Sequence, residues 1–287
     1  MDCVWYVSGF DRPWEAAVVG ALAGALSEGS AAFHPEVYVE GGTAFFPSGG
    51  LVRSWQSMTI AERARLVTFK GRLWHLWGEA PSWWPLVRLR AQTVHTSLDA
   101  DPDWSGQPTR LQSWHARHGE NVIPPVFDAR AVWDEPAHER EAFPTLILAA
   151  KPDRALREAI SKSELVAVPL SAARTRDALA KASLLFVDDA ATNALLAAYM
   201  AVRGVPVVAQ PRAEVALNAT LGEGGFLVPR GDWKETLDNA QGPPGRMAAA
   251  AARRHLADTH GTERSVRALE SLYRSVLYAD GKGNKKK

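Results

Sequence analysis

The chain has 287 residues. That is enough for two α/β domains, because single hydrophobic cores stop growing at about 250 to 300 residues. Its 33 Lys and Arg nearly balance its 32 Asp and Glu, which excludes a general attraction to nucleic acid or anionic lipid and leaves only local anion sites.

The single cysteine, Cys3, lies in the first apolar run. A single cysteine excludes an intrachain disulfide and a framework of cysteine-bound metal. Its place in an apolar run indicates a buried structural thiol in a reducing compartment. No stretch approaches the roughly 20 apolar residues that span a bilayer, so we expect a cytoplasmic protein.

Strands and helices alternate along the first half of the sequence. Apolar runs predict strands at Cys3–Ser8, Glu36–Val39, Arg72–Trp77, Thr93–Thr96 and Asn121–Val126, with helices at Trp14–Leu26 and Ile60–Phe69. Ser57–Thr59 provides a cap for the second helix, and a short helix precedes the strand at Thr93. This strand-loop-helix order is typical of a doubly wound α/β domain.

The composition changes near the middle of the chain. Ten of the eleven tryptophans precede Asp134, and the charged, Pro-containing stretch Asp134–Phe143 is suited to an interdomain linker. After it we predict strands at Leu146–Ala149, Leu165–Val168, Leu184–Val187, Val205–Ala209 and Gly225–Val228, and helices at Arg154–Ser161, Thr175–Lys181, Ala194–Val202, Trp233–Asn239, Met247–Ala257 and Thr262–Tyr278.

These patterns predict four parts. We expect an N-terminal Rossmann-like domain at residues 1–136, a second one at 144–262, a closing helix at 263–280 and a disordered tail at 281–287. Ligands in such folds bind beyond the carboxyl ends of the parallel strands, so functional residues are sought there.

The stretch Leu184–Gln210 reads as a parallel strand-helix-strand crossover. Thr192 and Asn193 are good N-caps for its helix, and the N–H groups from Ala194 onward could bind a diphosphate. Capping alone is the alternative role for Thr192 and Asn193. The carboxylates of Asp188 and Asp189 would repel that anion unless a divalent cation intervened, and we interpret them as solvated.

Two histidines in the first half have different predicted roles. His95 lies at a strand end, where it could stabilise charge on a phosphate or sugar hydroxyl; a histidine bonded within its own loop is the alternative. His75 alternates with aromatic residues, which favours a satisfied interior histidine. His115 and His118 have no third ligand, so we predict no metal site. Most tryptophans are expected in the core, with stacking on an acceptor as the alternative.

Several segments resemble the large retaining nucleotide-sugar family of GT-B glycosyltransferases. Tyr199–Ala209 (YMAVRGVPVVA) and Gly224–Asp232 (GGFLVPRGD) are similar to its donor-domain motifs. The helix bearing Leu269 and Tyr273 is similar to its closing helix, and Ala91–Ser97 (AQTVHTS) is similar to the strand end that carries its acceptor-domain histidine.

The resemblance implies two Rossmann-like domains facing across a cleft, with the C-terminal helix crossing back to the first domain. It implies a nucleotide-sugar donor in the second domain, an acceptor against the first, and no metal or other cofactor. By position, His95 would be catalytic. The donor diphosphate would be bound by the residues matching the family's phosphate loops, namely Gly9, Lys151, Arg154, Thr192, Asn193 and Ala194.

The chain also departs from the family pattern. The two family glutamates, which bind the donor sugar and the ribose, would fall at Ala191 and Tyr199, and the second half has one βα unit fewer. The alternative is therefore a catalytically degenerate GT-B protein acting as a binding or regulatory subunit of a partner glycosyltransferase. Peripheral membrane contact is left open. The acceptor could be a saccharide, lipid or protein, and the sequence names neither base nor sugar.

Overall fold

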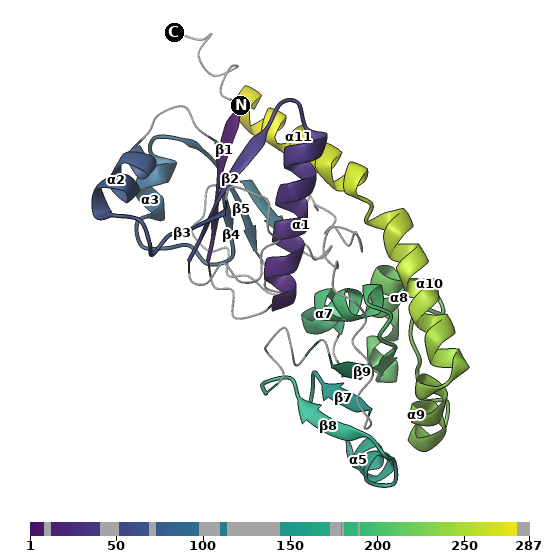
Figure 1. The fold of residues 1–287 in the computed structure, drawn as a ribbon. Helices are drawn as coiled ribbons and strands as arrows, with labels where there is room; N and C mark the ends of the chain where they lie inside the picture. Colours follow the sequence, from purple (N-terminus) through teal and green to yellow (C-terminus); the bar gives the residue numbers. More distant parts are fainter. Residues whose placement is uncertain are drawn as a thin grey trace. The chain divides into compact units, whose positions relative to one another are not determined.

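The computed structural model describes residues 1–8, 13–40, 52–68, 73–97, 110–113, 144–172, 179, 181–188 and 190–279. The chain divides into two compact units (Figure 1). Unit 1 comprises residues 1–11, 15–126 and 262–287, and unit 2 comprises residues 12–14 and 127–261. Each unit is built on its own parallel sheet.

Unit 1 contains a six-stranded sheet in the order β3-β2-β1-β4-β5-β6, with every pairing parallel. Its strands are β1 (Asp2–Val7), β2 (His34–Val39), β3 (Val52–Ser54), β4 (Leu73–Trp77), β5 (Gln92–Ser97) and β6 (Arg110–Ser113). β1 and β4 are buried on both faces, as expected for strands of a parallel sheet covered by helices.

Helices cover both faces of this sheet. α2 (Ile60–Thr68) and α3 (Trp84–Arg88) lie on one side, and α1 (Pro13–Gly29) and α11 (Thr262–Ala279) lie on the other (Figure 1). Under α2 and α3 is an aromatic cluster that includes Tyr6, Trp55, Trp74 and Trp84. The buried Cys3 thiol confirms the structural role predicted for it, and burial raises its pKa to about 12.

The closing helix α11 is held to unit 1 by buried side chains. The Tyr273 hydroxyl lies 2.7 Å from His75 Nδ1, and the Tyr273 ring meets Phe33 edge to face at 5.2 Å. Ser30 Oγ donates a hydrogen bond of 2.5 Å to the Glu270 carboxylate. The prediction that the C-terminal helix returns to the first domain is confirmed.

Unit 2 contains a four-stranded parallel sheet in the order β10-β9-β7-β8. The strands are β7 (Thr145–Leu148), β8 (Val166–Pro169), β9 (Ala182–Val187) and β10 (Val207–Ala209). A strand was predicted at Gly225–Val228. In its place the structure has a single parallel bridge, from Leu227 to Val208 of β10.

The helices of unit 2 are α5 (Arg154–Ser161), α7 (Ala190–Val202), the 3-10 turn η1 (Pro211–Ala213), α8 (Glu214–Leu221), α9 (Trp233–Gln241) and α10 (Pro243–Thr259). α7 is buried from Leu196 to Val202, because β9, β10, α8 and α10 surround it. α10 packs against α7, α8 and α9 and so closes the outer layer of the unit.

The structure corrects some predicted boundaries. α7 begins at Ala190 rather than Ala194, so the small-polar loop after β9 is shorter than predicted; Ala190 and Ala191 are strong helix formers that extend the helix. β3, β6 and α8 were not predicted. The predicted strand Asn121–Val126, the linker Asp134–Phe143 and the tail at 281–287 lie outside the described residues, as does most of the predicted helix Thr175–Lys181.

Candidate functional site

His95 lies near the carboxyl end of β5, beside β4 on one edge and β6 on the other. Its side chain is buried, and Nε2 lies 2.7 Å from the backbone oxygen of Gly78. A carbonyl oxygen only accepts, so Nε2 must carry the proton of this hydrogen bond. In the neutral imidazole Nδ1 is then the basic nitrogen, and the Gly78 carbonyl fixes both the tautomer and the ring orientation.

The turn after β4 that supplies this carbonyl depends on glycine. Gly78 has φ +91°, and a Cβ at this position would lie 2.3 Å from the Ser8 backbone oxygen. The Gly78 N–H donates to Thr96 O at 3.0 Å, and the Ser8 N–H donates to Trp77 O at 3.0 Å. Backbone hydrogen bonds therefore join the carboxyl ends of β1, β4 and β5 around His95.

His75 is fully buried on the opposite side of the sheet from the aromatic cluster. Nδ1 lies 2.7 Å from the Tyr273 hydroxyl and Nε2 lies 2.7 Å from Thr96 Oγ1, while the ring stacks on Trp77 at 4.1 Å. Burial, reinforced by nearby His95, holds the pKa of His75 well below 6.5. The interpretation of His75 as a satisfied interior histidine is confirmed.

The described tryptophans of unit 1 build its core. Trp74, Trp77 and Trp84 are almost wholly buried, which confirms the prediction for them. Trp83 is half-buried and stacks on Trp55 with ring centroids 4.8 Å apart. The four residues Trp104, Trp114, His115 and His118, like Gly9 of the predicted diphosphate set, lie outside the described residues.

In unit 2, loops from separate strands are joined beyond the carboxyl ends of the sheet. Asp153 caps α5, with Oδ1 accepting the Leu156 N–H at 2.7 Å, and its Oδ2 accepts from Gln210 Nε2 at 2.8 Å. The Leu156 N–H and then the Gln210 amide lower the pKa of Asp153, which keeps it ionised. Since β9 lies between β7 and β10, this hydrogen bond crosses the end of β9.

Asp188, at the end of β9, is paired with Arg212. Arg212 Nε donates to Asp188 O at 3.0 Å, and one Nη donates to its carboxylate at 2.5 Å. The interpretation of Asp188 as a solvated carboxylate is therefore wrong, because η1 brings a cation to it. Neither Gln210 nor Arg212 was singled out from the sequence, although Gln210 directly follows the apolar strand β10 and Arg212 lies in the next turn, where a polar residue is a signal for this edge.

Lys151 and Arg154 both lie after β7, as predicted, and both are exposed. Neither has an ion pair within the described part of the chain. The N–H groups of Ala190, Ala191 and Thr192 at the start of α7 have no carbonyl four residues back in that helix, whereas the N–H of Ala194 bonds within it. Thr192 and Asn193 therefore lie in the first helical turn rather than in a capping loop.

The two positions of the family glutamates lie on α7. Ala191 is in its first turn, and Tyr199 is buried in the interior of unit 2, with the Arg203 guanidinium 5.9 Å from its ring centroid. No carboxylate is supplied at either position. Among the described residues, no three His, Cys, Asp or Glu side chains come together as a metal site would require.

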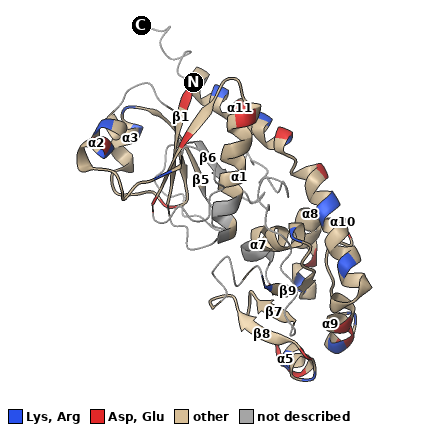
Figure 2. Ribbon diagram, in the orientation of Figure 1, with Lys and Arg blue, Asp and Glu red and all other residues tan. Residues whose placement is uncertain are grey.

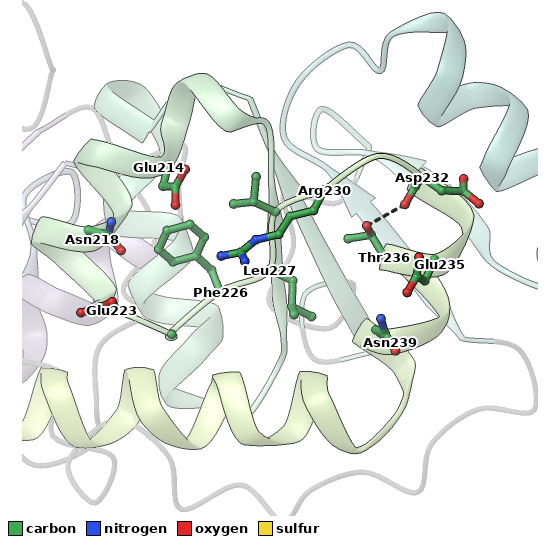
Figure 3. Close-up of a pocket in the computed structure, with 12 residues that line it drawn as sticks. Glu214, Asn218, Glu223, Phe226, Leu227, Arg230, Asp232, Glu235, Thr236 and Asn239 are labelled. Atoms are coloured by element: carbon green, nitrogen blue, oxygen red, sulfur yellow. Dashed lines mark hydrogen bonds between the residues drawn. The ribbon is translucent and has the colours of Figure 1, made fainter.

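A hollow of about 470 Å³ lies in unit 2 between α8, α9 and the segment joining them (Figure 3). Arg230 extends into it between Phe226 and Thr236. Four carboxylates also line it, from Glu214, Glu223, Asp232 and Glu235. This excess of negative charge opposes a diphosphate, and none of the residues predicted to bind the donor lines this hollow.

No family model matches the sequence. No curated protein matches it either. Among solved structures, AviGT4, a glycosyltransferase involved in avilamycin A biosynthesis, matches with a TM-score of 0.60 at 16% identity, over 96% of this chain and 98% of that one. A glycosyltransferase from Rickettsia africae ESF-5 matches with a TM-score of 0.57 at 12% identity, over 96% and 98%.

WaaG, a glycosyltransferase involved in lipopolysaccharide biosynthesis, matches with a TM-score of 0.52 at 14% identity, over 95% of this chain and 99% of that one. These likenesses span nearly the full length of each protein. They show that the chain has the fold of the GT-B glycosyltransferases, built on two Rossmann-like units. This confirms the predicted α/β fold class with two Rossmann-like units.

Proposed function

We propose that this protein is a glycosyltransferase that transfers a sugar from a nucleotide-sugar donor to an acceptor hydroxyl. The observation that carries the proposal is the GT-B fold with an oriented histidine, His95, near the carboxyl end of β5 in unit 1. The donor binds in unit 2 beyond its strands, and the acceptor binds against unit 1. The acceptor is a saccharide, lipid or protein.

The chemistry requires charge stabilisation more than a strong base. The bond from the anomeric carbon to the diphosphate breaks, the acceptor oxygen bonds to that carbon, and the acceptor proton leaves with the departing phosphate or a nearby base. Negative charge grows on the diphosphate, where Lys151, Arg154 and the N–H groups at the start of α7 stabilise it. His95 contacts the transferring sugar or the departing phosphate through its oriented imidazole.

In this proposal the reaction needs no metal or other cofactor. Three features favour a metal-independent site. Asp188, one of the acids at the carboxyl edge of the unit 2 sheet, is already paired with Arg212, and Asp153 is committed to Leu156 and Gln210. Lys151 and Arg154 supply the positive charge that a metal ion would otherwise bring to a diphosphate.

A second candidate function is a binding or regulatory subunit of a partner glycosyltransferase. One observation favours it: Ala191 and Tyr199 occupy the positions at which the resembling family has glutamates, and Tyr199 is buried in the core. A protein of this kind retains the fold but gives no turnover. The two candidates differ in whether the chain itself releases nucleoside diphosphate from a sugar donor.

The first experiment measures release of nucleoside diphosphate from UDP-, GDP- and dTDP-sugars, with and without acceptor candidates. We expect turnover by the wild type, and His95→Ala should lower kcat by about a hundredfold or more, because a positioned acid-base group contributes roughly 10²- to 10⁴-fold. His34→Ala is the matched control, since His34 is exposed at the start of β2. Donor binding without turnover in any mixture would favour the subunit function.

A further inference from the structure

Exposed apolar side chains gather on the two helices that cover one face of unit 1. Eight large hydrophobic residues are exposed among those described, and three of them are Ile60 at 84%, Leu86 at 56% and Leu89 at 81%. Ile60 begins α2, while Leu86 and Leu89 lie on α3 and its C-cap. The two helices pack against each other (Figure 1). These three side chains contribute little to the core and remain available to a partner.

The same helices carry an excess of positive charge (Figure 2). Residues 60–68 and 84–90, which form α2, α3 and the turn after α3, contain four Arg but only one Glu, whereas the whole chain has a net charge of +1. Arg65 and Arg90 are exposed and Arg88 is half-buried, and none of the three has an ion pair within the described residues. This charge is local, in a chain whose overall composition is balanced.

The neighbouring charges already have structural roles. Glu62 forms a capping box with Thr59, in which its carboxylate accepts from the Thr59 N–H at 2.7 Å and Thr59 Oγ1 accepts from the Glu62 N–H at 3.2 Å. Arg63 lies over Trp55 at 5.7 Å and donates to Gln56 O. Three arginines and three apolar side chains of these two packed helices have no such role, and we call them together the α2–α3 patch (Ile60, Arg65, Leu86, Arg88, Leu89 and Arg90).

We propose that the α2–α3 patch docks on the surface of a bilayer that contains anionic lipid. Leucine and isoleucine side chains enter the boundary between headgroups and acyl chains, while the arginines pair with lipid phosphates. A lipid surface imposes no fixed shape, which suits single protruding side chains on two short helices. No helix among the described residues is long and apolar enough to cross a membrane.

Sedimentation of the full-length protein with sucrose-loaded vesicles tests the proposal. We expect binding to phosphatidylcholine vesicles that contain phosphatidylglycerol, little binding to phosphatidylcholine alone, and release at high salt. Arg88→Gln and Arg90→Gln should each weaken binding roughly fivefold, because one cation near an anionic surface contributes about that factor. Leu86→Ser with Leu89→Ser should weaken it by at least a similar factor.

The matched controls lie on α10, where Met247 is 71% exposed and Arg253 is also exposed. Met247→Ser and Arg253→Gln should leave vesicle binding unchanged, and thermal unfolding of every variant verifies folding. The proposal is overturned if the wild type binds neither vesicle, or if the α10 variants weaken binding as much as the patch variants. It also fails if the Arg88→Gln and Arg90→Gln variants lose binding to nucleic acid or an acidic protein, while the variant with Leu86→Ser and Leu89→Ser binds vesicles as well as the wild type. Donor turnover is not measured, so this outcome is independent of the proposed transferase activity.

Discussion

His75 and His95 lie on adjacent strands of unit 1 and have opposite surroundings. His75 is bonded at both ring nitrogens by Tyr273 and Thr96 and stacks on Trp77, so it has no capacity left for a substrate. His95 is bonded through Nε2 to a loop carbonyl at the strand end, where ligands of parallel sheets bind. A single residue type thus serves the core at one position and the candidate site at the other.

The burial of His75 predicts a pH-dependent stability. In the folded chain the pKa of His75 lies well below 6.5, the ordinary value that applies in the unfolded chain. At a pH between these two pKa values, the unfolded chain therefore binds more protons at this residue. Stability is therefore complete above about pH 6.5 and falls as the pH drops, by up to about 1.4 kcal/mol per pH unit. Urea unfolding across this range should show the slope, and His75→Gln should flatten it while His34→Gln does not. Equal slopes in all three proteins would refute this assignment.

Gly78 provides a second test at the residue scale. Gly78→Ala meets the Ser8 carbonyl at 2.3 Å, whereas Gly204→Ala, at a similar φ of +80°, meets nothing within 4 Å. We expect Gly204→Ala to cost about 1 kcal/mol of unfolding free energy from the left-handed backbone alone, and Gly78→Ala to cost about 3 kcal/mol. Chemical denaturation measures both. A cost for Gly78→Ala no larger than that for Gly204→Ala would contradict the close approach of the two loops.

At the scale of elements, α11 completes unit 1 through Tyr273. Tyr273→Phe leaves His75 Nδ1 without its hydroxyl partner in a fully buried position, so we expect a loss of about 1 to 3 kcal/mol in unfolding free energy. Tyr278→Phe is the control on the same helix, because Tyr278 is 74% exposed and should cost less than about 0.5 kcal/mol. Equal effects would mean that the hydroxyl bond does not hold the helix.

Long apolar runs made most elements predictable from the sequence. β1, β4 and β9 are mostly hydrophobic segments because helices cover both faces of the sheet. β3 and β6 were missed because they are short strands at the two sheet edges with sequences VRS and RLQS, which contain no such run. The start of α7 was misplaced because Thr192 and Asn193 looked like caps, while Ala190 and Ala191 had already begun the helix.

The candidate site was predictable only in part, for a topological reason. The strand-end position of His95 and the exposed Lys151 and Arg154 follow from local patterns. The bond between Asp153 and Gln210 joins residues 57 apart in the sequence, and it exists because β9 lies between β7 and β10. The pairing of Asp188 with Arg212 depends in the same way on the turn after β10. Such contacts between loops require the strand order, which no single segment encodes.

At the scale of the whole molecule, the fold was recognisable from the sequence because several segments resemble motifs of the retaining GT-B glycosyltransferases. These segments occur along the chain in the same order and spacing as in that family. The likeness to AviGT4 and to the Rickettsia africae glycosyltransferase extends over 96% of this chain and 98% of each of those, although among the described residues the sheet of unit 2 has four strands and that of unit 1 has six. We propose that unit 2 retains a donor site although Ala191 and Tyr199 occupy the positions at which the resembling family has glutamates.

Titration calorimetry of the full chain with UDP-, GDP- and dTDP-sugars and with the free diphosphates tests this claim most directly. We predict saturable binding of at least one nucleotide sugar. Lys151→Ala should weaken it about tenfold through loss of a charged hydrogen bond, while Lys234→Ala on α9, whose ammonium pairs with Asp238, should leave it unchanged. Failure of every nucleotide sugar and diphosphate to bind the folded wild-type protein would contradict a donor site in unit 2.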